Sequence, residues 1–279
     1  MIVYSAALLS ASVASQSLKN ARIGYQTWLR GLEASAVTVS SETTDGPKDM
    51  PLHEDTATYW EPSAMPATWE VDFGGPEAMD YVGLAGHSFG TDSTAVLVET
   101  STGATVGSPS VQVWTTFASS LSPANDDPIL FLDTSIVARY VRITLTGSTA
   151  PKLAVVYAGE ILAMSEPIRG GGHAPLNMMR STVLHQSLSN GGQFLGQEFR
   201  RMGVTGKASF ENLDPAWYRS TFDPFVKAAR RYPYFFAWRP EQYPLELGYV
   251  WTDADISPSY MGQLDWMQVQ WKMTGIGNE

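Results

Sequence analysis

A histidine and a serine stand side by side in Gly86-His87-Ser88-Phe89-Gly90, a pairing that nucleophilic hydrolysis could use. Such chemistry needs the serine on a sharp strand-to-helix turn of the Gly-x-Ser-x-Gly type, with an acid to orient the histidine. The segment follows a strand-like run, but no helix is predicted after it and no acid partner is evident. We therefore predict an exposed loop, in which His87 is either a sugar contact or part of a plain turn.

Other groups that could carry chemistry are too scattered along the chain to form a recognisable site. The histidines lack the i, i+4 spacing of a helical metal site, and no cysteine supplements them. They are His53, His87, His173 and His185. Asp126 and Asp127 are adjacent and point different ways, whereas a glycosidase needs two carboxylates facing each other about 5–10 Å apart. The sequence therefore predicts no enzyme, no metal site and no cofactor.

Length and composition predict a β-rich protein of two domains. The chain has 279 residues, more than one average domain, and 44% of them are hydrophobic, which is ample for packed cores. Its 24 glycines and 17 prolines suit a turn-rich fold. The absence of cysteine excludes disulfides and favours assembly in a reducing cytoplasm.

The acidic charge of the chain belongs to its first half. Residues 1–165 carry 7 Lys and Arg against 17 Asp and Glu, while residues 166–279 carry 11 of each. The excess of negative charge repels phosphate backbones, so we predict no nucleic-acid partner. The charge boundary coincides with residues 166–179, a Gly- and Pro-rich stretch typical of a linker. We therefore predict domains at 1–165 and 180–279.

Short strand-like runs recur through the first half, divided by clusters of Gly, Pro, Asn and Asp. The runs are 36–40, 68–73, 80–85, 94–99, 111–117, 129–132, 140–145 and 153–164. Many short strands without a long helical pattern predict a β-sandwich, with Trp60 and Trp69 in its core. Residues 1–16 lack the basic start of a signal peptide and are predicted to form a leading strand or arm. No run reaches the roughly 20 apolar residues that cross a bilayer, so no membrane insertion is predicted.

Two stretches of the first half resemble the discoidin-type (galactose-binding-like) β-sandwich, a jelly roll. They are Thr-Tyr-Trp-Glu-Pro-Ser-Ala-Met-Pro-Ala-Thr-Trp-Glu-Val-Asp-Phe-Gly at 58–74 and Ala-Arg-Tyr-Val-Arg-Ile at 138–143. Trp60, Trp69, Asp72-Phe73-Gly74 and Gly159-Glu160-Ile161 stand in the order of the family, and the resemblance covers residues 22–164. The family is used mainly to bind surfaces and sugars, so the resemblance implies recognition and not catalysis.

The resemblance also raises the question of calcium. Discoidin-like domains often hold a structural Ca²⁺ through an Asp, a Thr and a late Glu, and Asp55, Thr58 and Glu160 match those positions. However, His53 and Glu54 stand where the family often has Asp and Gly, and the missing Gly hinders the sharp loop that presents carbonyl oxygens. We therefore predict that Asp55 caps a turn, that Thr58 supports it, and that no metal binds.

For a sugar ligand, loop residues are the predicted contacts. Tyr59 is adjacent to Trp60 and faces away from it, so its ring could stack on a sugar. His87 and Phe89 lie in the loop described above. The predicted carbohydrate site is therefore Tyr59, His87 and Phe89, and the acidic half favours a neutral or cationic glycan.

The second half mixes helices with strands. Asp214-Pro215 and Asp223-Pro224 each place Asp at an N-cap and Pro at the first helical position, which predicts helices at 215–220 and 224–231. Strands are predicted at 205–210, 234–238, 248–252 and 266–274. The last alternates cleanly, with Met267, Val269, Trp271 and Met273 on one face. We predict a sheet or small barrel with short helices, in which 266–274 is an edge-like strand that mediates self-assembly.

This half resembles the tail-tube-related distal tail and baseplate-hub proteins of long-tailed bacteriophages. The residues that carry the resemblance are Phe235-Phe236-Ala237-Trp238-Arg239-Pro240, Tyr243-Pro244 and Gly248-Tyr249-Val250-Trp251-Thr252, within a match over 180–276. Many distal tail proteins place the tube-like domain first and the carbohydrate-binding-type domain second, the reverse of the order here.

The tail resemblance implies a structural protein of the virion, assembled in the host cytoplasm. It would form a homo-oligomeric ring, taken as a hexamer, at the end of the tail tube, with the sandwich facing outward. The implied partners are tail-tube, hub and fibre proteins and a host surface glycan. The alternative is a stand-alone carbohydrate-binding module of a polysaccharide-degrading system, and oligomeric state would discriminate between the two.

Overall fold

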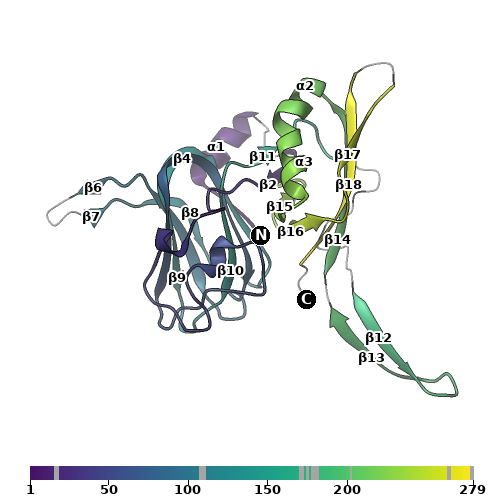
Figure 1. The fold of residues 1–279 in the computed structure, drawn as a ribbon, viewed down its shortest axis with the longest axis horizontal. Coiled ribbons are helices and arrows are strands. Elements are labelled where there is room, and N and C mark those ends of the chain that lie inside the picture. The colour runs from purple at the N-terminus through teal and green to yellow at the C-terminus, as the bar shows by residue number, and fades with distance from the viewer. Residues whose placement is uncertain are drawn as a thin grey trace.

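The computed structural model describes residues 1–15, 19–106, 111–169, 173, 176, 182–201, 203–262 and 265–276, and it is mainly β. Much of the predicted linker, including residues 170–172 and 177–179, lies outside the described residues. Two seven-stranded sheets make up the body, and two small hairpins extend from it (Figure 1). None of the described helices is long and apolar enough to cross a membrane.

The first sheet has the order β10-β4-β9-β5-β8, with β1 beside β9 and β3 beside β4. Its strands are β1 (Ile2–Tyr4), β3 (Val37–Val39), β4 (Ala67–His87), β5 (Ala95–Ser101), β8 (Thr115–Leu121), β9 (Ile129–Thr146) and β10 (Leu153–Gly159). The N-terminal strand β1 runs parallel to β9, and helix α1 (Ala6–Ser15) follows it. The predicted leading strand is thus confirmed for three residues, and a helix continues it.

Strands β4 and β9 are long and each combines two of the predicted strands. They pair from Ala67 opposite Leu145 to Leu84 opposite Ile129, with register shifts between Asp72 and Glu77 and between Met79 and Tyr81. Trp69 from the first part of β4 and Leu84 from the second part lie in the same buried core. Because one strand supplies both walls of that core, the sheet folds over on itself as a sandwich. Trp60 and Trp69 are fully buried in it, as predicted.

The second sheet has the order β11-β2-β15-β16-β18-β14, with β17 beside β18. Its strands are β2 (Arg22–Gly24), β11 (Leu162–Ala163), β14 (Val204–Leu213), β15 (Tyr234–Ala237), β16 (Leu247–Thr252), β17 (Ser257–Tyr260) and β18 (Met267–Gly275). Strands β2 and β11 come from residues predicted for the first domain, yet they complete the second sheet. A fragment that begins at residue 180 would therefore lack two of its strands.

Strand β18 confirms the predicted alternation but not the predicted edge. Met267, Val269, Trp271 and Met273 are all buried on one face. However, β18 pairs with β14 on one side and with β16 and β17 on the other. Its backbone groups are thus already used within the chain, so β18 is not a free edge for self-assembly.

A continuous helical segment packs on the second sheet. It comprises α2 (Pro215–Trp217), a π-helical turn (Tyr218–Phe222) and α3 (Asp223–Ala229). Asp214 caps it as predicted, because its carboxylate accepts hydrogen bonds from the backbone N–H groups of Ala216 and Trp217, both at 2.8 Å. Asp223 lies within the run and does not start a separate helix. Phe222 and Phe225 place the helix in the core of the second sheet.

The remaining elements are short. Two single turns of 3₁₀-helix, Ala34–Ala36 and Met50–Leu52, lie before and after β3. One hairpin pairs β6 (Thr105–Val106) with β7 (Val111–Gln112), and the other pairs β12 (Val183–Leu188) with β13 (Phe194–Arg201). Figure 1 shows them projecting from opposite ends of the molecule.

A third apolar core joins the sandwich to the second sheet. Every residue of β10 is buried, which is typical of a strand covered on both faces. Tyr81 and Tyr157 from the sandwich meet Phe235 and Tyr249 from the second sheet in this core. The rings of Phe235 and Tyr249 lie 5.0 Å apart, and that of Tyr157 lies 5.6 Å from Phe235. The two sheets therefore share a packed apolar interface.

Candidate functional site

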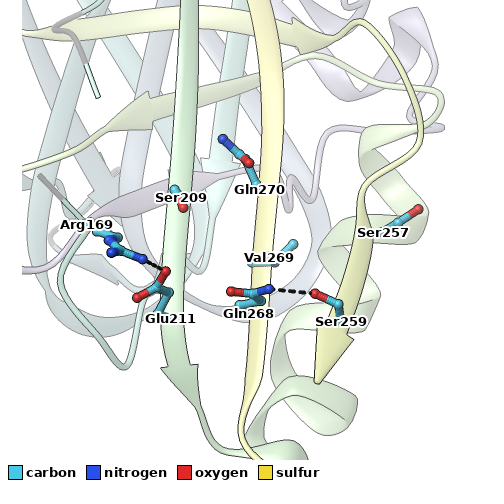
Figure 2. A pocket seen from close by; sticks show the side chains of 8 residues that line it. All are labelled: Arg169, Ser209, Glu211, Ser257, Ser259, Gln268, Val269 and Gln270. Carbon is cyan, nitrogen blue, oxygen red and sulfur yellow. Dashed lines mark hydrogen bonds and ion pairs between the residues drawn. The ribbon is translucent and has the colours of Figure 1, made fainter. Parts of the chain in front are cut away.

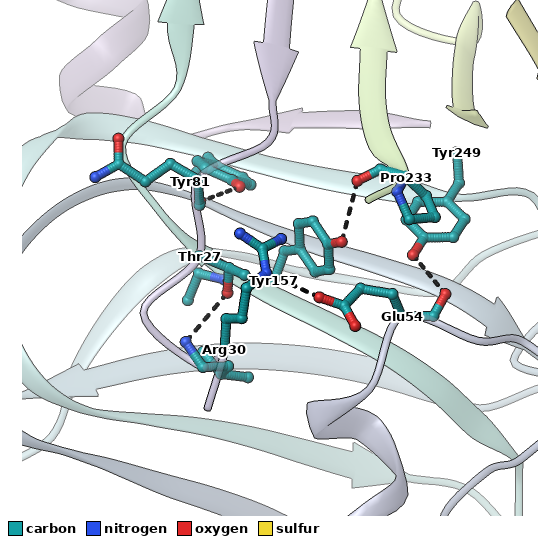
Figure 3. A network of polar contacts seen from close by, with 10 residues as sticks. Thr27, Arg30, Glu54, Tyr81, Tyr157, Pro233 and Tyr249 are labelled. Atoms are coloured by element: carbon teal, nitrogen blue, oxygen red, sulfur yellow. Dashed lines mark hydrogen bonds and ion pairs between the residues drawn. The ribbon is translucent and has the colours of Figure 1, made fainter. Parts of the chain in front are cut away.

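Tyrosine hydroxyls link the two sheets at the margin of their shared core (Figure 3). The Tyr249 hydroxyl donates to the carbonyl oxygen of Glu54 at 2.8 Å, and the Tyr157 hydroxyl donates to that of Pro233 at 3.1 Å. Each bond crosses between the sandwich and the second sheet. Burial raises the pKa of Tyr157 to about 12, so its hydroxyl stays protonated and can donate at neutral pH.

An arginine sits at the same margin. The Arg30 Nε lies 2.9 Å from Glu54 Oε1, and its guanidinium lies 3.8 Å from the centre of the Tyr232 ring. Arg30 lies between β2 and β3 and Glu54 lies between β3 and β4, whereas Tyr232 lies two residues before β15. The ion pair therefore holds the 53–57 loop while the cation–π contact ties it to the second sheet.

The loop itself is shaped by Asp55, in agreement with the predicted turn. Asp55 Oδ1 accepts from the backbone N–H groups of Ala57 and Thr58, and Oδ2 accepts from the Thr58 hydroxyl, all at 2.9 Å. Burial works against the charge of Asp55, but these hydrogen bonds lower its pKa overall. The carboxylate is thus ionised at neutral pH and is engaged within its own turn.

Two of the three predicted sugar contacts are corrected by the structure. Phe89 is fully buried in the sandwich core, and His87 is 5% exposed with its ring stacked on that of Phe89 at 4.3 Å. The side chain of Phe89, in the loop after β4, turns inward because its burial removes apolar area from water. Neither ring offers a face to a ligand.

Tyr59, the third predicted contact, is partly exposed. Its ring packs against the shared core, and the Lys152 ammonium lies 4.3 Å from the ring centre. A sugar stacking on this ring would compete with that cation–π contact. The structure therefore keeps the three predicted residues on the sandwich but does not bring them together as an open aromatic surface.

The residues considered for hydrolysis have structural partners. The Ser88 hydroxyl donates to Asp92 Oδ2 at 2.5 Å, and Lys152 N–H donates to Ser88 Oγ at 2.8 Å. Burial lowers the pKa of His87 to about 4, so the ring is neutral, but it makes no bond to Ser88 among the contacts of the described residues. Asp126 accepts from the N–H groups of Gly90 and Thr91 at 2.8 and 3.0 Å. No nucleophile–base pair forms at His87 and Ser88.

An open cleft lies where the 53–57 loop faces the second sheet. This interdomain cleft has a volume of about 660 Å³, and it is lined by the loop together with Pro233, Tyr249 and Trp251. Tyr249 and Trp251 are two positions apart on β16 and so project from the same face of the strand. Tyr249 is buried in the shared core, while Trp251 at the margin is only partly buried. The cleft therefore combines an aromatic wall with a polar loop.

A second, more polar cleft of about 540 Å³ lies on the second sheet (Figure 2). It is lined by Glu211 of β14, Gln268 of β18 and Ser259 of β17, among others. Glu211 forms an ion pair with Arg169, and Gln268 Nε2 donates to Ser259 Oγ at 2.9 Å. Four of its polar side chains thus pair with one another, and none of the described residues that line it is aromatic.

The sequence could not have identified the interdomain cleft. The sequence predicted only a turn around Asp55, at positions that match the calcium loop of the family in part. It assigned no ligand contact to Trp251, one of several aromatic residues of the second half. Nearly 200 positions separate the loop from Trp251, and no local pattern links them. Only the shared core, which brings β16 against the sandwich, places them together.

Residues 36–157 match the family model of the F5/8 type C domain. The match runs from the approach to β3 into β10, and this part of the chain is a discoidin-like β-sandwich domain. The match stops before β11 and does not include β14–β18 of the second sheet. No curated protein matches the chain.

Several solved structures are similar to part of the chain. Chitosan-binding module 1 of a chitosanase/glucanase from Paenibacillus sp. IK-5 is 17% identical, with 48% of this chain and 98% of that one covered and a TM-score of 0.36. The family 32 CBM of C. perfringens NanJ, in complex with galactose, is 16% identical, with 45% and 94% covered and a TM-score of 0.35. SpGH29 is 19% identical at a TM-score of 0.37, and the chain spans only 28% of its length. At these identities and TM-scores, the likenesses say nothing about a ligand of this chain.

Proposed function

We propose that this chain is a non-catalytic recognition protein whose discoidin-like domain binds a neutral or cationic surface glycan. The observation that carries the proposal is the F5/8 type C match over residues 36–157. Discoidin-type modules serve mainly to bind surfaces and sugars, and the sandwich here retains the architecture expected of them. This corresponds to the carbohydrate-binding-module interpretation of the sequence.

The side chains of the sandwich favour binding over chemistry. Ser88 and Asp55 form hydrogen bonds within their own turns, and Asp126 accepts from the backbone N–H of Gly90 in the loop after β4. Among the described residues, no three His, Asp or Glu side chains gather in a way that could hold a metal ion. The acidic excess of residues 1–165 opposes polyanions, which leaves neutral and cationic glycans as the favoured ligand classes.

A glycan array probed with the labelled full chain tests the proposal. We expect neutral glycans to be retained and sulfated or polysialylated glycans to be passed over at physiological salt. An array without any bound glycan, or one in which only anionic glycans bind, would refute it. Repeating the array with calcium and with EDTA should give the same pattern, because the Asp55 turn forms through hydrogen bonds alone.

A second candidate is a self-assembling structural subunit of a bacteriophage tail tip, the role implied by the resemblance of residues 180–276. One observation favours it: the β12–β13 hairpin carries large apolar side chains in solvent. Leu188, Phe194 and Leu195 are 60%, 64% and 66% exposed. Exposed apolar groups of this kind mark protein–protein contacts. In this role the chain would form a ring, taken as a hexamer, with tail-tube, hub and fibre proteins as partners in the virion.

Light scattering coupled to size exclusion tests the second candidate. We expect the full chain to form a closed oligomer that dissociates in a Phe194→Ser/Leu195→Ser variant. The matched control is Val106→Ser/Val111→Ser on the β6–β7 hairpin, where both valines are similarly exposed at 61% and 62%. A monomeric wild-type chain, or equal dissociation in both variants, would count against assembly through β12–β13.

A further inference from the structure

We propose that the interdomain cleft is a saccharide subsite shared between the discoidin-like domain and the second sheet. The proposal rests on the proposed function, and it assigns the ligand to a place that neither domain forms alone. The sandwich supplies the 53–57 loop and the second sheet supplies Pro233, Tyr249 and Trp251. The ligand class is a neutral hexose-type sugar with one apolar face.

The aromatic wall matches the apolar face of a sugar. Trp251 is partly buried, and no other aromatic ring stacks on it among the described residues. Its neighbour on the same strand face, Tyr249, is 1% exposed and is held by its hydrogen bond to Glu54. The indole is therefore mounted on a rigid strand, and a rigid ring costs little conformational entropy when a ligand stacks on it.

The opposite wall of the cleft, the 53–57 loop, offers hydrogen-bonding groups. His53, Asp55 and Thr56 are exposed at the rim of the cleft. The three hydrogen bonds to Asp55 fix the turn and use both lone pairs of Oδ1 and one of Oδ2, so Oδ2 keeps one lone pair that can accept from a sugar hydroxyl. Because the pKa of Asp55 is lowered, the carboxylate is negative at neutral pH and repels uronic, sialic and sulfated sugars.

Contacts between the 53–57 loop and the second sheet fix the distance between the two walls of the cleft. Arg30 pairs with Glu54 in the loop and stacks on Tyr232 beside the second sheet. The Tyr249 hydroxyl donates a hydrogen bond to the backbone carbonyl oxygen of the same Glu54. Loop and sheet therefore cannot separate without breaking these contacts, and a sugar would meet both walls already in place.

The test is an NMR titration of the full chain with galactose, glucose, N-acetylgalactosamine and N-acetylglucosamine. The indole N–H signal of Trp251 is assigned by its loss in Trp251→Phe, and saturation-transfer spectra report binding to any site. We expect at least one sugar to shift the Trp251 signal and to bind at least about tenfold more weakly to Trp251→Ala. Trp266→Ala is the matched control, because Trp266 is exposed and does not line the cleft.

The outcomes separate the subsite from the proposed function. Saturation transfer without a Trp251 shift, or with equal binding to Trp251→Ala, would overturn the subsite and leave glycan recognition elsewhere on the domain. No saturation transfer from any of the four sugars, together with an empty glycan array, would overturn both. Thermal unfolding of Trp251→Ala at the wild-type temperature would show that a loss of binding is not a loss of fold.

Discussion

A single methyl group at Gly83 should reveal how tightly the two sheets are joined. Gly83 lies in β4, opposite Phe235 of β15 across the shared core. A Cβ atom at this position would come within 2.5 Å of Phe235 Cε2 and 2.8 Å of its Cδ2. The Phe235 ring is fully buried, so the ring or the second sheet must shift within a packed core to admit the methyl group. Overpacking of this kind costs about 1–3 kcal/mol.

Gly75→Ala provides the matched control for Gly83→Ala. Gly75 belongs to the same strand, and nothing lies within 4 Å of an added Cβ there. Both substitutions restrict the unfolded chain alike, so that effect cancels in the comparison. We expect the free energy of unfolding of Gly83→Ala to lie about 1–3 kcal/mol below that of Gly75→Ala, with a Tm roughly 2–10 °C lower.

Urea denaturation followed by tryptophan fluorescence measures the difference, and a double variant tests its origin. Phe235→Ala alone should cost about 3–5 kcal/mol through the cavity that it leaves. Combined with Gly83→Ala, the loss should be smaller than the sum by about 0.5–3 kcal/mol, because the new methyl group no longer meets the ring. Equal stability of Gly83→Ala and Gly75→Ala, or strictly additive losses, would refute a packed interface at this point.

Three further variants test individual sites. Burial lowers the pKa of His87 to about 4, so the unfolded chain takes up a proton at higher pH than the folded chain does. The free energy of unfolding should therefore fall by up to about 3 kcal/mol as pH drops from about 6.5 to 4, and urea melts of His87→Gln should lack this fall. Burial raises the pKa of Asp80 to about 6, although the nearby Arg22 opposes this, so the unfolded chain loses its proton at lower pH than the folded chain does. The free energy of unfolding should therefore fall by up to about 3 kcal/mol as pH rises from about 4 to 6, and an Asp80→Asn profile parallel to that of the wild type would contradict this. Asp214→Ala removes both capping bonds and should lower stability by about 1 kcal/mol in thermal melts, whereas an unchanged Tm would show that the cap is dispensable.

The sandwich could be anticipated from sequence because its signals are local. Trp60, Trp69 and the alternation around them predicted core residues, and these are buried. The long pairing of β4 with β9 was less accessible, because Gly74-Gly75 reads as a break between two strands. In the structure the strand continues through a register shift at this point. A local pattern gives the faces of a strand but does not say whether an interruption ends it.

The second sheet shows where local patterns fail. Strands β2 and β11 have three and two residues, too few for a periodicity to appear. They join the second sheet because β2 pairs with β15 and β11 with β2, contacts that span more than a hundred residues. The alternation of β18 predicted its buried face correctly, yet alternation carries no information on how many neighbours a strand has.

The candidate site was the least predictable part. Phe89 and His87 looked like loop residues, and their burial depends on how the loop closes over the sandwich core. Asp55 was correctly predicted as a turn residue, because Asp followed by Thr three positions later is a local arrangement. Trp251 gained significance only from the packing of β16 against the sandwich. A cleft formed by residues from two sheets cannot be predicted from sequence when no motif spans both sides.

The most direct test of the central claim is calorimetric titration of the full chain with a neutral glycan from the array and with its sulfated analogue. Recognition by an acidic, discoidin-like domain predicts one saturable site per chain for the neutral glycan and weaker binding of the sulfated one. The difference should shrink as salt rises, because screening shortens the reach of the protein's charge to about 8 Å at physiological ionic strength. Tighter binding of the sulfated glycan, or no saturable heat with either, would contradict the account.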